Sequence, residues 1–235
     1  MRDEIKHVTQ QFIEANFSES EVVWIGGSAA KGNLTKESDI DLVIIDEAET
    51  PRLQCYEFQG WKIEAFIYTA LSLELQFQAA RYRGIPTIIR MCADGLLIKD
   101  ERGTGKEVTE RAVSLFEQGP ERWSEGRIGE AKYQITDHLS DFRSSEDFEE
   151  SVFILNKLVS TLAEMVLKAE GKWTGEGKWF ARELRSYDHE LSGKLVSSSR
   201  HFMQTEDKNE LISLIHSVLD QYGGELFEGH REFLQ

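Results

Sequence analysis

The pattern of apolar and polar positions changes about halfway along the chain. In the first half, short apolar runs bounded by turn residues predict β-strands, and runs of helical period lie between them. The predicted strands are residues 22–25, 40–45, 54–58, 61–68 and 96–100, and the predicted helices are residues 2–17, 71–83 and 105–118. Residues 87–93 are ambiguous in this pattern, and a helical continuation is one interpretation of them.

Beyond Gly119-Pro120 the apolar pattern is helical throughout. The predicted helices there are residues 121–142, 151–169, 177–184, 192–203 and 207–222. Because Gly and Pro interrupt regular structure, this dipeptide is the predicted boundary between two domains, residues 1–118 and 119–235. The sequence therefore predicts an α+β chain, in which a sheet with flanking helices is followed by an all-α helical bundle.

A Gly-Gly-Ser turn follows the first predicted strand. Gly27 permits backbone angles that other residues avoid, and it lets a ligand approach the chain closely. Ser28 is predicted to cap a short helix over residues 29–32, whose free N–H groups and hydroxyl suit a phosphate oxygen. Such a tripeptide alone is more often a simple turn, so its position between two apolar strands is what favours a phosphate site.

Two aspartates open the second predicted strand. Asp39 and Asp41 are two residues apart, so their side chains are expected on the same face of the sheet. Two carboxylates held this close repel each other and favour a divalent cation between them. Oxygen ligands beside a phosphate pocket indicate Mg²⁺, and in a site with two ions such carboxylates bridge both. The segment therefore predicts Mg²⁺-assisted attack on a nucleoside triphosphate.

These residues also resemble a known family. Gly27-Ser28, then Gly32, then the run Ser38-Asp39-Ile40-Asp41-Leu42-Val43 are similar to the signature of the DNA polymerase β nucleotidyltransferase superfamily. The resemblance is strong over residues 22–68, moderate over 69–185 and slight afterwards. It implies an N-terminal nucleotidyltransferase fold, with a mixed sheet of about five strands flanked by helices, and a helical domain that completes the nucleotide and acceptor cleft.

The superfamily needs a third carboxylate on a neighbouring strand. Residues 54–58 and 61–68 are predicted to form a hairpin with Gly60 in its turn. One face of the second strand is predicted to carry Trp61, Ile63, Ala65 and Ile67, and the other Lys62, Glu64, Phe66 and Tyr68. Glu64 is the only acid of that strand, and an ionised Glu among apolar neighbours is costly unless it is paired or metal-bound. By resemblance, Glu64 is the third ligand, in place of the commoner Asp. The alternative is an exposed Glu on an edge strand.

A Gly-broken segment of the second half carries two candidate cations. Lys178 and Arg182 are four residues apart at the start of a predicted helix, so they share one face and suit the charge that develops on a leaving pyrophosphate. The stretch Gly-Lys-Trp…Gly-Lys-Trp…Arg resembles kanamycin-nucleotidyltransferase-like proteins, whose helical domain supplies a Lys to the nucleotide. The alternative is that Trp173 and Trp179 are core anchors and the two cations are solvated.

The numbers of acidic and basic residues limit the kinds of molecule that are expected as partners. The chain has 42 acidic against 27 basic residues, a net charge of −15. Nucleic-acid binding depends on Lys and Arg that neutralise phosphates, and no strong cluster of basic residues is apparent. We therefore expect no nucleic acid as a partner, but a small acceptor, for which a cationic molecule would be favourably steered.

The sequence also indicates in which cellular compartment the protein is expected. It has no apolar run long enough to span a membrane and no apolar leader at its start, so a cytoplasmic protein without a membrane partner is expected. Cys55 and Cys92 have no metal-ligand spacing and are predicted to be reduced core residues. The oligomeric state is left open, a homodimer included.

Together these observations predict an enzyme. A nucleoside triphosphate, expected to be ATP, binds with its phosphates at Gly27 and Ser28, and two Mg²⁺ ions lie on Asp39, Asp41 and Glu64. An acceptor hydroxyl attacks the α-phosphorus, and pyrophosphate leaves. The general base is open: it is Glu64 itself if the second metal is absent, and otherwise an acid of the helical domain, for which Glu130 and Asp137 are candidates by position only.

Three other interpretations stay open. By resemblance, an antitoxin-like nucleotidyltransferase would modify a protein partner, and a chain that kept only the fold would be a non-catalytic nucleotide sensor. Arg182 and His189, six residues apart, formally match the Arg-x(4–6)-His pattern of HEPN ribonucleases, but a pattern of two residues arises freely by chance. The acceptor cannot be named from the sequence, although resemblance suggests aminoglycosides.

Overall fold

The computed structural model describes residues 2–30, 32 and 38–231. The chain forms two compact units, Met1–Pro120 and Glu121–Gln235, and each is described by itself. None of the helices in the described residues combines the length and the apolar character that crossing a membrane requires.

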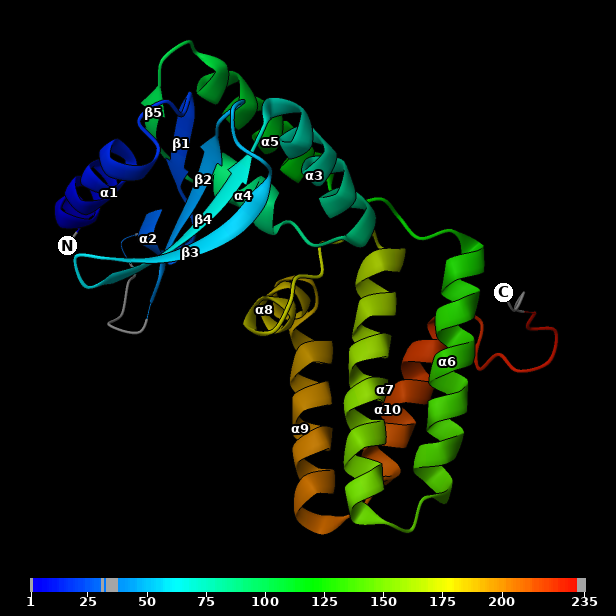
Figure 1. Ribbon diagram of the computed structural model, residues 1–235. Coiled ribbons are helices and arrows are strands. Elements are labelled where there is room, and N and C mark those ends of the chain that lie inside the picture. The colour runs from blue at the N-terminus through cyan, green and yellow to red at the C-terminus, as the bar shows by residue number, and fades with distance from the viewer. Residues whose placement is uncertain (1, 31, 33–37, 232–235) are drawn as a thin grey trace. The chain divides into compact units, whose positions relative to one another are not determined.

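The N-terminal unit is built around a mixed sheet (Figure 1). In the described residues the sheet has five strands in the order β3-β4-β2-β1-β5. The strands are β1 (Val22–Ile25), β2 (Ile40–Ile45), β3 (Arg52–Phe58), β4 (Trp61–Tyr68) and β5 (Leu96–Asp100). Only the β2–β4 pair is parallel among these strands, whereas the β1–β2, β1–β5 and β3–β4 pairs are antiparallel. The predicted mixed sheet is therefore confirmed.

Helices cover both faces of this sheet. One face packs against α1 (Arg2–Asn16), and the other meets α3 (Ala70–Arg83), α4 (Thr87–Ala93) and α5 (Thr104–Gln118). On the α1 face the core joins apolar side chains of the helix to alternate residues of β1, β2 and β4: Ile5, Phe12, Ile13, Phe17, Val23, Ile25, Ile40, Leu42, Ile44, Ile63, Ala65 and Ile67. On the other face, the buried Trp24 donates its indole N–H to Thr109 Oγ1 of α5 at 2.9 Å.

The predicted hairpin is present, and its turn follows from local chemistry. Gln59 and Gly60 both have positive φ, 50° and 81°, which is the backbone pattern of a tight turn that matches the twist of the strands. On β4, burial alternates as predicted, with Ile63, Ala65 and Ile67 buried and the residues between them half-buried. The same alternation places Glu64 on the face opposite the α1 core.

The C-terminal unit is helical throughout its described elements, which confirms the predicted bundle. Its helices are α6 (Glu125–Ser144), α7 (Phe148–Ala169), α8 (Lys178–Tyr187), α9 (His189–Thr205) and α10 (Asn209–Gln221). The apolar stripe of α7 lies at the centre of one core with residues of the other helices, among them Ile135, Leu139, Phe142, Leu158, Leu162, Leu195, Phe202, Leu211 and Ile215. The core is continuous because each helix presents apolar residues three and four positions apart.

Three helices begin where a polar side chain caps them and not where the apolar pattern begins. Helix α7 starts at Phe148, not at residue 151, because Asp147 Oδ1 accepts a hydrogen bond from the Glu150 N–H at 3.0 Å. Helix α6 starts at Glu125, not at residue 121, because Ser124 Oγ accepts a hydrogen bond from the Arg127 N–H at 3.3 Å. Helix α9 starts at His189, not at residue 192, because Asp188 Oδ1 accepts from the Leu191 N–H at 2.8 Å. The predicted starts of these helices were wrong by about one turn.

One such cap allows a test of the N-terminal unit. Thr69 Oγ1 accepts from the Ser72 N–H and Ser72 Oγ accepts from the Thr69 N–H, so α3 begins with a reciprocal capping box. We expect Thr69→Ala to lower the free energy of unfolding by about 1 kcal/mol, measured by urea denaturation. Thr87→Ala is the control, because Thr87 opens α4 without a side-chain cap. An equal loss in both variants would contradict this role.

Candidate active site

The register of two parallel strands places two carboxylates side by side. Asp41 on β2 pairs with Glu64 on β4, and the apolar neighbours Ile40 and Leu42 pair with Ile63 and Ala65. Since the apolar partners point into the α1 core, both acids point to the other face. Asp41 and Glu64 are half-buried, whereas the residues beside them in sequence on β2 and β4 are fully buried.

Asp39 contributes to the same electrostatic environment. It is half-buried and lies just before β2, two residues ahead of Asp41. Burial, and then the negative charge of Asp39, raise the pKa of the Glu64 carboxyl above its ordinary value. The structure therefore brings Asp39 close enough to Glu64 for its charge to disfavour the ionised form of Glu64.

The turn after β1 lies against the same carboxylates. The Gly26 N–H donates to the Asp41 carbonyl oxygen at 2.8 Å, which extends the β1–β2 pairing by one residue. Helix α2 (Gly27–Ala30) follows at once. Ser28 lies inside its first turn, so the predicted cap at Ser28 with a helix over residues 29–32 was wrong; Lys31 of that range lies outside the described residues.

Gly27 is the residue that lets this turn approach Asp41. Its φ is +56°, and a Cβ atom placed there would lie 1.9 Å from Asp41 Oδ2. Any side chain at position 27 would therefore collide with the carboxylate as well as strain the backbone. The turn and the acid predicted from separate motifs are in contact, and the contact requires glycine.

Three carboxylates beside a glycine turn have the chemistry of a Mg²⁺ site. Mg²⁺ takes oxygen ligands and is commonly held by one or two carboxylates together with substrate phosphates. Asp39, Asp41 and Glu64 supply oxygen donors, and the absence of a Cβ at Gly27 leaves the backbone close to Asp41 Oδ2. These residues fit the predicted ion, although the number of ions stays a prediction.

A different group of possible metal-ligand atoms lies closer together than the oxygens of the three carboxylates. Among the described residues, a group of three ligating side chains with all donor atoms within 4.8 Å occurs at Asp137, His138 and Asp141 of α6. The Asp39, Asp41 and Glu64 oxygens are not so close as a set, which is the arrangement expected of like charges. The α6 group was not predicted as a site, and exposed acids one turn apart on a helix often approach this closely without an ion.

The two predicted cations of the helical unit lie on the first turns of α8. Lys178 and Arg182 are both exposed, and the Arg182 guanidinium lies over the Trp179 ring, with its Cζ 4.7 Å from the ring centroid. Trp173 is buried, as the core-anchor interpretation expected, but Trp179 is 37% exposed. A role for Lys178 and Arg182 at the nucleotide stays a prediction.

The cysteines differ from each other. Cys92 of α4 is buried, as predicted, and both thiols are free. Cys55 is exposed, so its predicted place in the core was wrong. It lies on β3, an edge strand whose residues are mostly exposed, and it pairs with Glu64 across the hairpin.

Comparison with known proteins agrees with this geometry. Residues 9–92 match the family model described as "Nucleotidyltransferase domain", which covers about a third of the chain. The matched range includes Gly27, Ser28, Asp39, Asp41 and Glu64 and excludes the helical unit. Residues 9–92 are thus similar to a nucleotidyltransferase domain, and the match supports a transferase.

Among solved structures, the chain is similar to a nucleotidyltransferase-like protein from Exiguobacterium sibiricum. The two are 12% identical, with 92% of this chain and 73% of that chain covered and a TM-score of 0.49, a likeness too low to support an inference about function. No curated protein matches the sequence.

The contact between Gly27 and Asp41 gives a prediction. We expect Gly27→Ala to abolish most nucleotidyl transfer, because the added methyl displaces the Asp41 carboxylate. Gly60→Ala is the matched control, since Gly60 also has a positive φ, +81°, but no atom within 4 Å of its Cβ position. Both variants should lose about 1 kcal/mol of folding stability or more from the backbone alone. Equal activity in the two variants would show that the collision is unimportant.

The raised pKa of Glu64 gives a second prediction. The folded state holds the Glu64 proton more tightly than the unfolded state, so ionisation of Glu64 costs stability as pH rises past its unfolded value of about 4.3. Without divalent cations, Glu64→Gln should therefore melt at a higher temperature than the parent at pH 7. The difference should vanish below about pH 4. A variant that melts lower than the parent at pH 7 would contradict the electrostatic cost.

Proposed function

We propose that this chain transfers a nucleoside monophosphate from a nucleoside triphosphate, ATP in the first instance, to a hydroxyl of a small acceptor, with release of pyrophosphate. The observation that supports it is the β2–β4 register, which sets Asp41 beside Glu64 within the matched nucleotidyltransferase domain. The closeness of Gly27 to Asp41 supports the same assignment, because the triphosphate and the carboxylates must meet at one point.

Each residue of the site has a proposed task. Asp39, Asp41 and Glu64 would hold Mg²⁺, which when bound supplies positive charge to the reacting phosphate and the leaving pyrophosphate. The backbone N–H groups at Gly27 and Ser28, at the start of α2, would donate to phosphate oxygens. The acidic groups thus orient the α-phosphorus, and the turn fixes the rest of the triphosphate.

The acceptor hydroxyl must lose a proton as its oxygen bonds to phosphorus and the bond to the pyrophosphate oxygen breaks. If the second metal ion is absent, Glu64 suits this role, because its raised pKa makes it a better proton acceptor than an ordinary carboxylate. Glu130 and Asp137 of α6 stay alternative candidates by position. The predicted contribution of Lys178 and Arg182 is to stabilise charge on the pyrophosphate.

The acceptor is proposed to be small, with cationic molecules tested first. The net charge of −15 disfavours a polyanionic acceptor and steers cations to the surface. Aminoglycosides remain the first class to test, by resemblance to the kanamycin-nucleotidyltransferase-like proteins.

Pyrophosphate release tests this proposal. The purified full chain is incubated with ATP, Mg²⁺ and a panel of aminoglycosides, lincosamides and nucleotides, and pyrophosphate is measured by a coupled assay. Asp41→Asn should lower the rate by more than about 100-fold, since even groups that only support a metal ligand are worth 10–100-fold. Glu57→Gln is the control, because Glu57 is an exposed acid on the neighbouring edge strand β3.

The other outcomes separate the alternatives. Label from radioactive ATP that appears on a protein after incubation with lysate, and not on any small molecule, would favour a protein-modifying enzyme. ATP binding without pyrophosphate release under every condition would favour a nucleotide sensor. Equal rates in Asp41→Asn and the parent would reject the site.

A further inference from the structure

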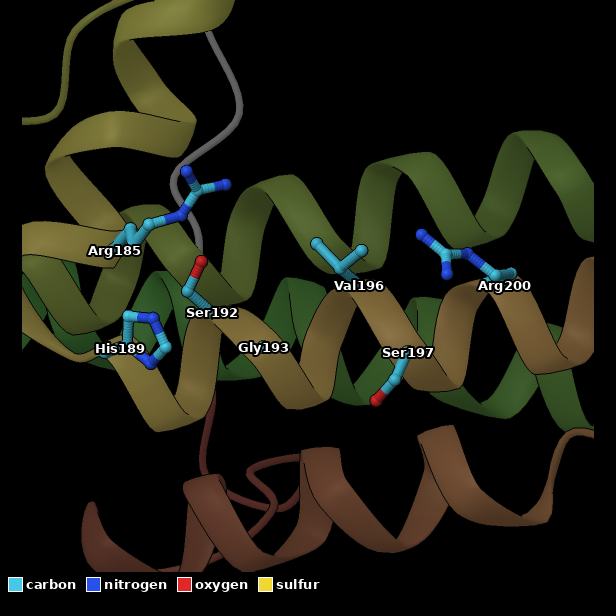
Figure 2. A pocket seen from close by; sticks show the side chains of 7 residues that line it. All are labelled: Arg185, His189, Ser192, Gly193, Val196, Ser197 and Arg200. Carbon is cyan, nitrogen blue, oxygen red and sulfur yellow. The ribbon is translucent and has the colours of Figure 1, made fainter.

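The helical unit contains a pocket without any acidic residue in its lining. It has a volume of about 240 Å³ and lies along α9 and the end of α8 (Figure 2). Its lining consists of Arg185, His189, Ser192, Gly193, Val196, Ser197 and Arg200. In a chain with 42 acidic residues against 27 basic ones, a pocket with two arginines and no carboxylate is a local reversal of charge.

The lining residues come together because α8 and α9 follow each other with a single capping residue between them. Asp188 ends α8 and caps α9, which places Arg185 one turn before His189. Along α9, Ser192, Val196 and Arg200 recur every four residues and so share one side of the helix. In Figure 2, the side chains of Arg185 and Arg200 and the Ser192 hydroxyl all extend to that side, with Val196 between the last two.

Ser192 offers the pocket a hydrogen-bonding group. The residue is only 5% exposed, and its hydroxyl extends to the pocket side of α9 (Figure 2) and has no hydrogen-bond partner among the described residues. The hydroxyl is not among the fully buried polar atoms that lack a partner, so it is accessible and can donate a hydrogen bond to a ligand oxygen.

The two arginines are available to the same ligand. Arg185 and Arg200 are exposed and make no ion pair or hydrogen bond with any of the described residues. Arginine binds phosphate through two parallel N–H donors, and such charge-assisted bonds are the strong ones. A phosphate held by Arg185 would also lie beside the Ser192 hydroxyl.

The distance between Ser192 and Arg200 along α9 indicates what size of ligand would contact both residues. Ser192 and Arg200 are eight residues apart, about 12 Å along the helix axis at 1.5 Å per residue. One phosphate is too small to contact both ends, and the middle of the pocket is lined by Gly193 and Val196, which offer no charge. Gly193 has no atom within 4 Å of its Cβ position, so there is open space beside it for the uncharged part of a ligand.

From these features, we propose that the α8–α9 pocket binds an organic bisphosphate of sugar size, with one phosphate at Arg185 and Ser192 and the other at Arg200. The proposed site is lined wholly by residues of the helical unit and does not depend on the proposed reaction. Arg185, and not Arg182, lines the pocket with His189, so the pocket does not contain the Arg–His pair of the ribonuclease pattern.

Isothermal titration calorimetry on the full chain tests this site, with fructose 1,6-bisphosphate, fructose 6-phosphate, inorganic phosphate and a single-stranded oligonucleotide as probes. We expect the bisphosphate to bind once per chain and at least about tenfold more tightly than either monophosphate probe. Arg185→Gln, Arg200→Gln and Ser192→Ala should each weaken it about tenfold or more, as loss of a charge-assisted bond predicts. Lys194→Gln is the matched control, since Lys194 lies on α9 outside the pocket and pairs with Glu190.

Several results would overturn the proposal. These are equal affinity for monophosphate and bisphosphate, loss of affinity in Lys194→Gln as large as in Arg200→Gln, tighter binding of the oligonucleotide than of the bisphosphate, or no binding of the bisphosphate at millimolar concentration. Circular dichroism checks that each variant is folded. If Ser192→Ala fails to fold, the two arginine variants still decide the question, because both side chains are exposed.

Discussion

The parallel register of β2 and β4 is the constraint on which the candidate active site depends. Ile40, Leu42 and Ile44 on one strand and Ile63, Ala65 and Ile67 on the other are buried against α1, so neither strand can shift by one residue without exposing all of them. The same register fixes Asp41 opposite Glu64 on the other face. Apolar packing on one side of the sheet thus determines the position of the charges on the other.

This arrangement holds groups that repel each other. Burial and the charge of Asp39 raise the pKa of Glu64, so the ionised site is less stable than its parts would be in water. A fold that keeps such a cluster must offset its cost in the apolar core, and the core of this unit is continuous across β1, β2, β4 and α1. Gly27 adopts a positive φ without strain because it has no Cβ, and this brings the turn against Asp41.

The sequence predicted the structure best in elements where a single periodicity of apolar residues runs from end to end. The alternation on β4 predicted the face of Glu64, and the strict apolar stripe of α7 predicted the bundle core. The sequence predicted helix boundaries less well where a polar side chain caps the helix away from the first apolar residue of the pattern. Asp188 moves the start of α9 back to His189, and Ser124 delays α6. Cys55 was misplaced because strand order, which makes β3 an edge, is a tertiary property. The contact of Gly27 with Asp41 depends equally on how separate segments pack.

The pocket on α9 was missed for the same reason, and it changes what the net charge means. With α8 predicted to end at residue 184 and α9 to begin at residue 192, Arg185 and His189 fell between two helices and showed no shared face. The cap at Asp188 joins them to Ser192 and Arg200 in one lining. The net charge of −15 sets the electrostatic field of the chain at long range, and salt screens this field over roughly 10 Å. Within that distance the local side chains matter more, and Arg185 and Arg200, which have no ion-pair partner among the described residues, make the proposed phosphate site compatible with an acidic chain.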